Sequence, residues 1–408
     1  MGTPAIPRRL AFTAGAQQLI NWGISFYMPG TFAGAIAADK GWSSPQIYLG
    51  LTLAMLIMAA VSPLVASLLA RFGGRLVVTS GTLLIAASCA MMAWSPSLVG
   101  WYGAWLLTGV GMRLSLYDAL FAAVVNLYGQ QARKTISQIT LAGGLASALF
   151  WPLGEALLTV MSWQDALRVY ALFGLLSAWL SYQLPRQRLG SSTKAKAPTA
   201  DGNRRNGIRY ALFIALITFI STGTSTHLPE FISHFGLPVA IGMLWGFGQT
   251  GARLGEVLAG RRITPLALMR FTALAMPLCF LLGVSSTAYA GCAAGFVLGY
   301  GAINGLVTIV KATLPLALFS AESYASRTGL LLIPGQLMAA VSPFAYAWLN
   351  HRLGIIGGMW VSTGLTLIVA GLALAMVREA GKAQDERNVE YPAAAVDQPI
   401  AKNNLAEE

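Results

Sequence analysis

An arginine inside an apolar run has the most specific chemistry in this chain. Gln249, Arg253 and Glu256 are spaced i, i+4 and i+7, which places them on one face of a helix. A guanidinium holds a carboxylate through two parallel hydrogen bonds, so this face predicts an organic-anion site formed by Gln249 and Arg253, with Glu256 as a proton-coupling candidate. The alternative is an internal pair between Arg253 and Glu256 that only neutralises the helix.

A second arginine, Arg113, lies in the middle of another apolar run and is a candidate second anchor for an anion. Tyr117 shares its helical face and is a candidate substrate contact. Asp118 is turned about 140° away if the helix is continuous, so we do not expect it to pair with Arg113. We interpret Asp118 as a tether to a neighbouring helix, or as another proton-coupling candidate.

Polar and aromatic residues also gather in other apolar runs. Asn21 and Tyr27 precede Pro29, and His227 precedes Pro229, so Tyr27 and His227 are positional counterparts. Histidine titrates near physiological pH, which makes His227 the leading proton-coupling candidate, with a packing histidine as the alternative. Asn21, Tyr27 and Trp151 are further candidates for substrate contact.

The elements that must position these residues are membrane spans. Hydrophobic residues make up 56% of the chain and charged residues 10%, with a mean hydropathy of +0.62, which indicates a polytopic membrane protein. Since a span needs roughly 20 apolar residues, the sequence predicts an all-α protein with twelve transmembrane helices. They begin near Leu10, Gln46, Leu76, Leu98, Thr135, Ala166, Arg209, Leu237, Ile263, Ala288, Thr328 and Ile355.

Three landmarks recur at a spacing of 191 residues, namely Arg71 with Arg262, Gly144 with Gly335, and Pro152 with Pro343. A repeat of this length indicates a duplicated bundle, as in transporters. We expect two pseudo-symmetric six-helix bundles over residues 1–184 and 209–378. A cytoplasmic linker over 185–208 joins them, and a disordered cytoplasmic tail follows over 379–408.

The net charge of +12 indicates membrane orientation and not a nucleic-acid partner. With the N-terminus inside, 21 of the 27 Lys and Arg residues fall on the cytoplasmic side and three on the other. Another three, Arg113, Arg253 and Arg270, lie within apolar runs. We therefore expect a multi-pass protein with both termini in the cytoplasm.

Two kinds of chemistry have no supporting pattern in the sequence. There is no G-x-x-x-x-G-K-[ST] phosphate loop, so transport must use ion or solute gradients and not ATP hydrolysis. Cys89, Cys279 and Cys292 have no C-x-x-C spacing, and we expect neither a metal site nor a cofactor. The chain is thus predicted to be a secondary transporter and not an enzyme.

Six spans, a linker, six spans and a basic turn after the second span resemble the major facilitator superfamily. Its signature in that turn is, roughly, G-x-x-x-D-R-x-G-x-R. Arg71, Gly73 and Arg75 match this cytoplasmic gating motif, whereas Ala66 and Ala70 replace its glycine and aspartate. The resemblance implies alternating access about a midplane cavity lined by the first span of each half.

Three short motifs resemble bacterial relatives of the monocarboxylate porters and arsenite effluxers: Tyr117-Asp118, Leu141-Ala142-Gly143-Gly144 and Phe150-Trp151-Pro152. In those porters an acid precedes the arginine of span eight by four residues. Here the arginine carries over as Arg253, but Gln249 replaces the acid.

The resemblance implies a monomer in the bacterial inner membrane that carries a small organic anion, coupled to protons or another ion. Export of an arsenite-like or drug-like toxic solute is the first alternative. A membrane sensor or scaffold without transport is the second.

Overall fold

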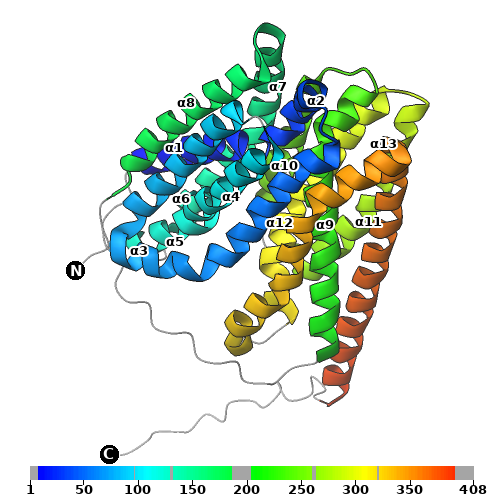
Figure 1. Ribbon diagram of the computed structural model, residues 1–408. Helices are drawn as coiled ribbons and strands as arrows, with labels where there is room; N and C mark the ends of the chain where they lie inside the picture. The colour runs from blue at the N-terminus through cyan, green and yellow to red at the C-terminus, as the bar shows by residue number, and fades with distance from the viewer. Residues whose placement is uncertain are drawn as a thin grey trace, which may run out of the picture.

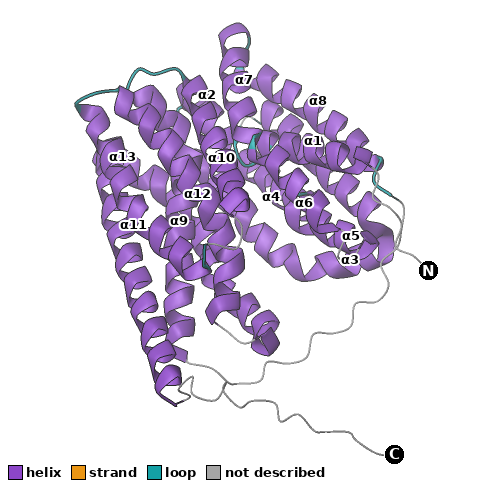
Figure 2. Cartoon of the chain, turned by 180° about the vertical axis from the view of Figure 1, so that it is seen from behind, coloured by secondary structure: helices purple, strands orange, loops and turns teal. Residues whose placement is uncertain are grey.

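The computed structural model describes residues 8–95, 97–128, 132–185, 204–259, 263–318 and 321–390. Within these ranges the chain is helical, with short connections and no strand (Figures 1 and 2). The helices are α1 (Arg8–Ile24), α2 (Met28–Lys40), α3 (Ser44–Trp94), α4 (Leu98–Ser115), α5 (Tyr117–Tyr128), α6 (Ala132–Gly144), α7 (Ala146–Val160), α8 (Trp163–Tyr182), α9 (Arg204–His234), η2 (Val239–Gly242), α10 (Met243–Ala259), α11 (Pro265–Val284), η4 (Ser285–Thr287), α12 (Gly291–Leu318) and α13 (Ala321–Glu390).

Local sequence explains where several helices begin and turn. Ser162 and Thr264 cap α8 and α11, because their side-chain oxygens accept backbone N–H groups from Asp165 and Ala267. α3 and α13 each turn sharply at a glycine with positive φ, Gly73 at 79° and Gly354 at 72°. The predicted spans that begin near Leu76 and Ile355 therefore follow directly on these turns.

Three predicted spans are built from two helices each. The first breaks between α1 and α2 just before Pro29, the fourth at Leu116 and the fifth at Leu145. Discontinuous helices inside a membrane protein commonly form substrate sites, because the break turns side chains and backbone groups toward a cavity. Tyr27, Tyr117 and Gly144 each lie beside one of these breaks.

The buried apolar residues form two large clusters, one in each half of the chain. One cluster draws on residues from Ile20 to Tyr170, and the other on residues from Tyr210 to Met376. Each half also contributes one residue to the other cluster: Trp151 of α7 packs in the C-terminal core, and Ala347 of α13 packs in the N-terminal core. This exchange suits two bundles that are packed separately and meet along α7 and α13.

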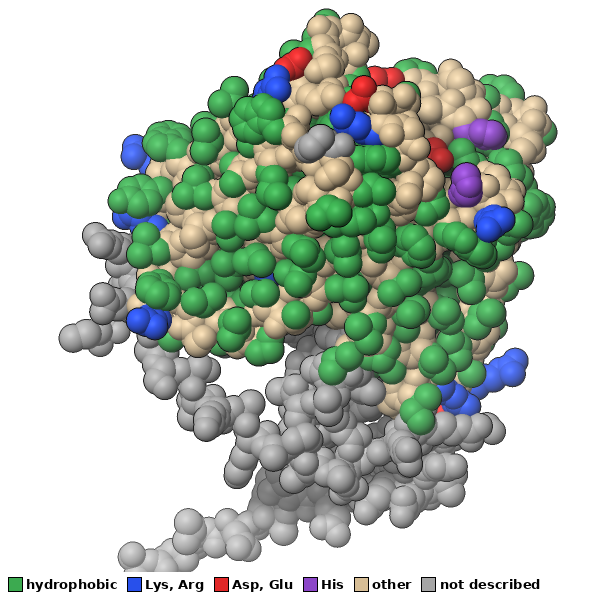
Figure 3. All heavy atoms as spheres, viewed as in Figure 1, with side chains coloured by type: hydrophobic (Ala, Val, Ile, Leu, Met, Phe, Trp, Pro, Cys, Tyr) green, Lys and Arg blue, Asp and Glu red, His purple; other side chains and the backbone are tan. Residues whose placement is uncertain are grey.

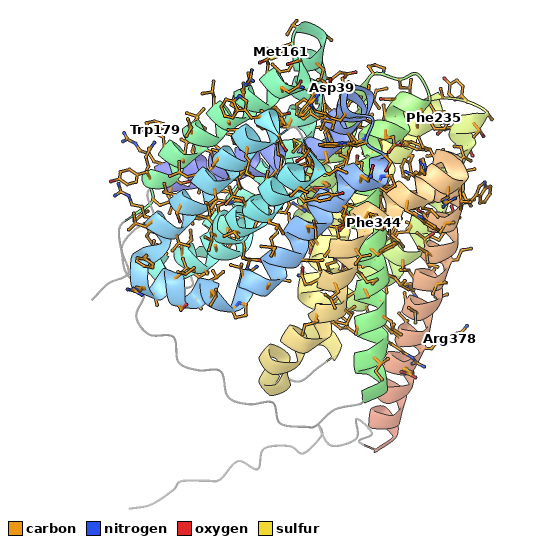
Figure 4. The ribbon with its side chains drawn as sticks, in the orientation of Figure 1. Asp39, Met161, Trp179, Phe235, Phe344 and Arg378 are labelled. Atoms are coloured by element: carbon orange, nitrogen blue, oxygen red, sulfur yellow. The ribbon has the colours of Figure 1, made fainter. Side chains whose placement is uncertain are left out.

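The two halves come together near one end of the molecule and diverge toward the other (Figure 1). Asp39 and Phe235 lie near the joined end. Arg378 of α13 lies near the opposite end of the molecule (Figure 4). Gly30 allows α2 to approach α9, since a Cβ there would lie 2.9 Å from the Thr226 carbonyl oxygen. The backbone N–H of Phe344 also donates to Thr52 Oγ1 at 3.4 Å, which links α13 to α3.

The outer surface fits a lipid environment. In Figure 3 hydrophobic side chains cover much of the visible face, and most charged ones lie near its edges. Large apolar side chains are widely exposed, among them Leu172, Leu278 and Leu367. In the described ranges seven helices are long and apolar enough to cross a membrane, and two of them, α3 and α13, turn midway. The count of twelve crossings stays a prediction.

The predicted linker and tail fall mostly outside the described residues. α13 continues past Arg378 to Glu390, so the first part of the segment predicted as tail is helical. Residues 186–203 and 391–408 are not described. An ion pair between Arg209 and Glu379 joins the first turns of α9 to the late part of α13.

Candidate substrate site

α10 carries Arg253 and Gln249 to the boundary between the halves. Glycines on α12 allow close contact on one side of α10, because a Cβ at Gly305 would lie 2.6 Å from the Gln249 carbonyl oxygen. Another face of α10 meets α6 of the N-terminal half at Gly144. A Cβ at Gly144 would lie 3.5 Å from Arg253 Nη1 and 3.9 Å from Gln249 Oε1. The predicted pair thus faces the opposite half, as a site between bundles requires.

The Arg253 guanidinium has no hydrogen-bond or ion-pair partner among the residues that the structure describes, and its Nε is buried. The alternative of an internal pair with Glu256 is therefore not realised in this conformation. Unpaired buried donors carry a desolvation cost of about 1 to 3 kcal/mol, and more when the group is charged. An anionic ligand would remove that cost.

A continuous series of aromatic rings lies near Arg253. Gly143, which lies against the Tyr117 hydroxyl, is the neighbour of Gly144, which lies against Arg253. Successive ring centroids are 5.0, 5.3, 6.4 and 5.4 Å apart. We call this series the aromatic row; its members are Phe121, Tyr117, Trp22, Tyr27 and Trp151. Tyr27 and Tyr117, two predicted contacts, therefore belong to one row with Trp22 and Phe121, while Trp151 at the end of the row is fully buried in the core of the C-terminal half.

Asn21 is occupied within the N-terminal half. Its Nδ2 donates to Thr82 Oγ1 at 2.9 Å and to Ser115 Oγ at 3.1 Å, and its Oδ1 accepts from Ser177 Oγ at 2.6 Å. With both ends of its amide engaged and no exposed surface, Asn21 holds α1 against α3, α4 and α8. We interpret it as a packing residue and not as a substrate contact.

The expectation that Arg113 and Asp118 do not pair is wrong. Arg113 Nη1 forms an ion pair with Asp118 Oδ2. The prediction assumed one continuous helix, but α4 ends at Ser115 and Leu116 is extended, with ψ of −172°. The break rotates Asp118 toward Arg113, so the anion capacity of Arg113 is already partly used.

His227 occupies the joined end of the molecule, 4% exposed, and contacts both halves. Its Nε2 lies 2.9 Å from the Pro343 carbonyl oxygen, and its Nδ1 lies 3.1 Å from Glu230 Oε2. The imidazole centroid is 3.9 Å from the ring of Tyr48 on α3 and 6.3 Å from that of Tyr346 on α13. Glu230 and Glu155 line an adjacent cavity of about 460 Å³.

The sequence profile of the Major Facilitator Superfamily matches residues 19–330. The chain belongs to this superfamily. The fold agrees with solved structures at 12% sequence identity: a mutant of the nucleoside transporter NupG has a TM-score of 0.73, with 90% of this chain and 99% of that chain covered. A bacterial homologue of the human lysosomal transporter Spinster, inward-facing and unoccupied, has a TM-score of 0.70, with 93% of this chain and 99% of that chain covered. No curated protein matches the sequence significantly.

Membership of the major facilitator superfamily makes the chain a membrane transporter and not an enzyme. The residues that resemble the superfamily's gating motif form the turn within α3. Gly73 makes the turn, and the Arg75 guanidinium lies 3.5 Å from the centroid of the Tyr182 ring on α8. Arg71 lies over the ring of Phe72, 5.2 Å from its centroid. A cation–π contact thus holds Arg75 against α8, in a motif where Ala70 replaces the usual aspartate.

Sequence reasoning missed Lys311, which it counted among basic residues on the cytoplasmic side. Lys311 is half-buried within α12, on one helical face with Asn304 and Thr308. Asn304 Oδ1 accepts a hydrogen bond from Ser221 of α9, so this face turns toward the first helix of the C-terminal half. The sequence does indicate this polar face, because Asn304, Thr308 and Lys311 have the same i, i+4, i+7 spacing as the polar residues of α10.

Proposed function

We propose that this transporter carries a small organic anion whose carboxylate binds Arg253, and that transport is coupled to protons. The observation that carries the proposal is the unpaired guanidinium of Arg253 at the boundary between the halves. A planar guanidinium with free donors can hold a carboxylate through two hydrogen bonds. Arg253 belongs to one half and the nearby Tyr27 and Tyr117 to the other, so one bound anion would contact both.

The hydrogen bonds of His227 support the proton coupling. The Pro343 carbonyl can only accept, so Nε2 must carry a hydrogen. In a neutral imidazole Nδ1 would then be an acceptor facing the Glu230 carboxylate, itself an acceptor. Both contacts are favourable only when the pair holds one more proton, either as imidazolium with carboxylate or as neutral imidazole with protonated Glu230. This pair is the coupling site in our proposal.

We place the protein in the bacterial inner membrane, with both termini and the linker in the cytoplasm, because basic residues concentrate on that side. Under this orientation the joined end of the halves faces outward. A reporter enzyme fused within residues 186–203 should be active only in its cytoplasmic form. Periplasmic activity from that fusion would overturn the orientation.

The proposed substrate class can be tested with acids and their uncharged amides. Purified protein is heated with benzoate, benzamide, lactate or lactamide, and exchange of labelled acid is then measured in proteoliposomes. At least one acid should raise the unfolding temperature of the protein and should also be exchanged across the membrane. Its matched amide should do neither, since only the acid can pair with Arg253. Equal stabilisation by acids and amides would contradict an anion site.

Export of a soft metalloid has less support. Cys89 is buried in the N-terminal half, while Cys279 and Cys292 lie in α11 and α12. The described part of the chain holds no group of three or more metal-ligating side chains. We therefore carry the organic anion forward as the candidate cargo.

A further inference from the structure

From the row of aromatic rings beside Arg253 we infer that the substrate is an aromatic carboxylate, a planar ring that bears one negative group. This inference rests on the proposed function and narrows it from organic anions in general. Arg253 accounts for the charge, and the aromatic row accounts for the body of the molecule.

Four of the five rings in the aromatic row are more exposed than the packed aromatic residues of the core, and the fifth, Trp151, is fully buried. Trp101, Trp105 and Trp245 are fully buried. Trp22, Tyr27, Tyr117 and Phe121, by contrast, are only partly buried, although they lie at or near the breaks within the predicted spans. Tyr27 packs against the buried clusters of both halves, which places this ring at the boundary between them. Its uncovered surface is available to a ligand.

The helix breaks and one glycine set the positions of these rings. Tyr27 N–H donates to the Trp22 carbonyl at 3.1 Å, which turns the chain before α2. A Cβ at Gly143 would lie 2.1 Å from the Tyr117 hydroxyl, so only glycine leaves room for that ring. The Trp22 indole N–H donates to Gln18 Oε1 at 3.2 Å, which fixes the plane of the indole. The row is therefore held in place before a ligand arrives.

The charges around the row favour an anion over a cation. The Arg253 guanidinium lies near Tyr27 and Tyr117. The nearest acid in sequence to the row, Asp118, is largely exposed and is paired with Arg113. An aromatic amine would thus meet an unpaired positive charge. An aromatic acid would pair with that charge and place its ring against Tyr27, Tyr117 or Trp22.

Geometry also favours a planar ring over a small aliphatic acid. Neighbouring rings in the row are between 5.0 and 6.4 Å apart, within the range of offset-stacked and edge-to-face pairs. A planar ligand can extend this series, whereas lactate would leave the exposed ring surfaces uncovered. Each aromatic pair contributes binding free energy beyond that from the buried apolar area. We therefore expect benzoate to bind roughly tenfold more tightly than cyclohexanecarboxylate.

The test compares benzoate, cyclohexanecarboxylate and lactate by binding to the purified wild-type protein. Each of these acids carries one negative charge. Benzoate and cyclohexanecarboxylate are also nearly equal in size, so these two differ mainly in planarity and aromatic character. Tighter binding of benzoate supports the inference. If cyclohexanecarboxylate or lactate binds as well as benzoate, the inference is overturned while the proposed function stands. If none of the acids binds, the proposed function fails and this inference fails with it.

Variants of Trp22 then assign the preference to the row. Trp22→Leu should remove most of the preference for benzoate and leave lactate binding within about twofold, while Trp22→Phe should restore it. Trp179 is 62% exposed on α8, away from the interface between the halves, so Trp179→Leu is the matched control and should change neither acid (Figure 4). Equal loss of benzoate and lactate binding in Trp22→Leu, with Trp22→Phe giving no recovery, would show a packing role only. Should Trp22→Leu fail to fold, the wild-type comparison still decides.

Discussion

Arg253→Ala should lower the affinity for the transported carboxylate by about a hundredfold or more and abolish its exchange. Truncating one partner of a buried, hydrogen-bonded charge pair costs about 2 to 5 kcal/mol, because the other charge is left without compensation. Arg253→Lys keeps the charge but loses the planar fork, so we expect a smaller loss of about tenfold. Binding titrations on purified variants and exchange in proteoliposomes measure both effects.

Arg270 is the matched control for this prediction. It is also an arginine within an apolar run of the C-terminal half, but its side chain is exposed on α11. Arg270→Ala should leave binding and exchange within about twofold, since exposed surface substitutions rarely exceed ±0.5 kcal/mol. Equal losses in the Arg253 and Arg270 variants would mean that removal of any arginine impairs the protein, and would contradict a specific anion contact.

His227→Gln should abolish uphill, proton-driven accumulation and leave energy-independent exchange of the same substrate. Glutamine can still donate a hydrogen bond to the Pro343 carbonyl, but it cannot hold the additional proton. Exchange in this variant should also lose the pH dependence that the wild type shows, because glutamine does not titrate. The measurement is accumulation and exchange in proteoliposomes with an imposed pH gradient.

The groups that face His227 define the controls. Glu230 is its partner on α9, Tyr48 and Tyr346 face it from α3 and α13, and Glu155 of α7 lies across the adjacent cavity. Glu230→Gln should reproduce the His227→Gln phenotype in weaker form. His234→Gln changes an exposed histidine in the last turn of the same helix and should have no effect. If His227→Gln leaves accumulation and its pH dependence unchanged, the coupling proton binds elsewhere, and Asp118 is the next residue to test.

The fold could be predicted from sequence because membrane spans have a strong compositional signal. Apolar runs and basic turns located the passes, and the Arg71, Gly73, Arg75 motif indicated the superfamily. Gly73 is at a position with φ of 79°, where glycine is strongly favoured. These features are local, so they are visible without knowledge of the packing.

The pairing of Arg113 with Asp118 could not be predicted because the break at Leu116 has no glycine or proline. Its cause is distant in sequence. The Ser115 carbonyl accepts hydrogen bonds from the side-chain amides of Gln17 at 3.1 Å and Gln18 at 2.8 Å. These bonds satisfy a backbone acceptor that a continuous helix would use internally, and so they stabilise the break.

The candidate site was predicted in part for a related reason. The spacing of Gln249 and Arg253 predicted that they share a face of α10, and both lie near Gly144 of the N-terminal half. Asn21 has an equally polar neighbourhood in sequence, yet it faces Thr82 and Ser177 inside its own bundle. Periodicity identifies the residues that share a face of a helix. It does not identify whether that face meets a neighbouring helix or the space between the halves.

Arg253 either binds a ligand or only balances the charge of Glu256. The deciding measurement uses the double variant Arg253→Ala with Glu256→Gln. Its binding and exchange of benzoate and lactate are compared with those of the wild type, with equal amounts of the two proteins in the membrane. Because the two residues are not paired in the structure, we predict normal expression of the double variant with no carboxylate binding and no exchange. Restored transport in the double variant, with poor expression of Arg253→Ala alone, would show that Arg253 is a structural charge and not an anion site.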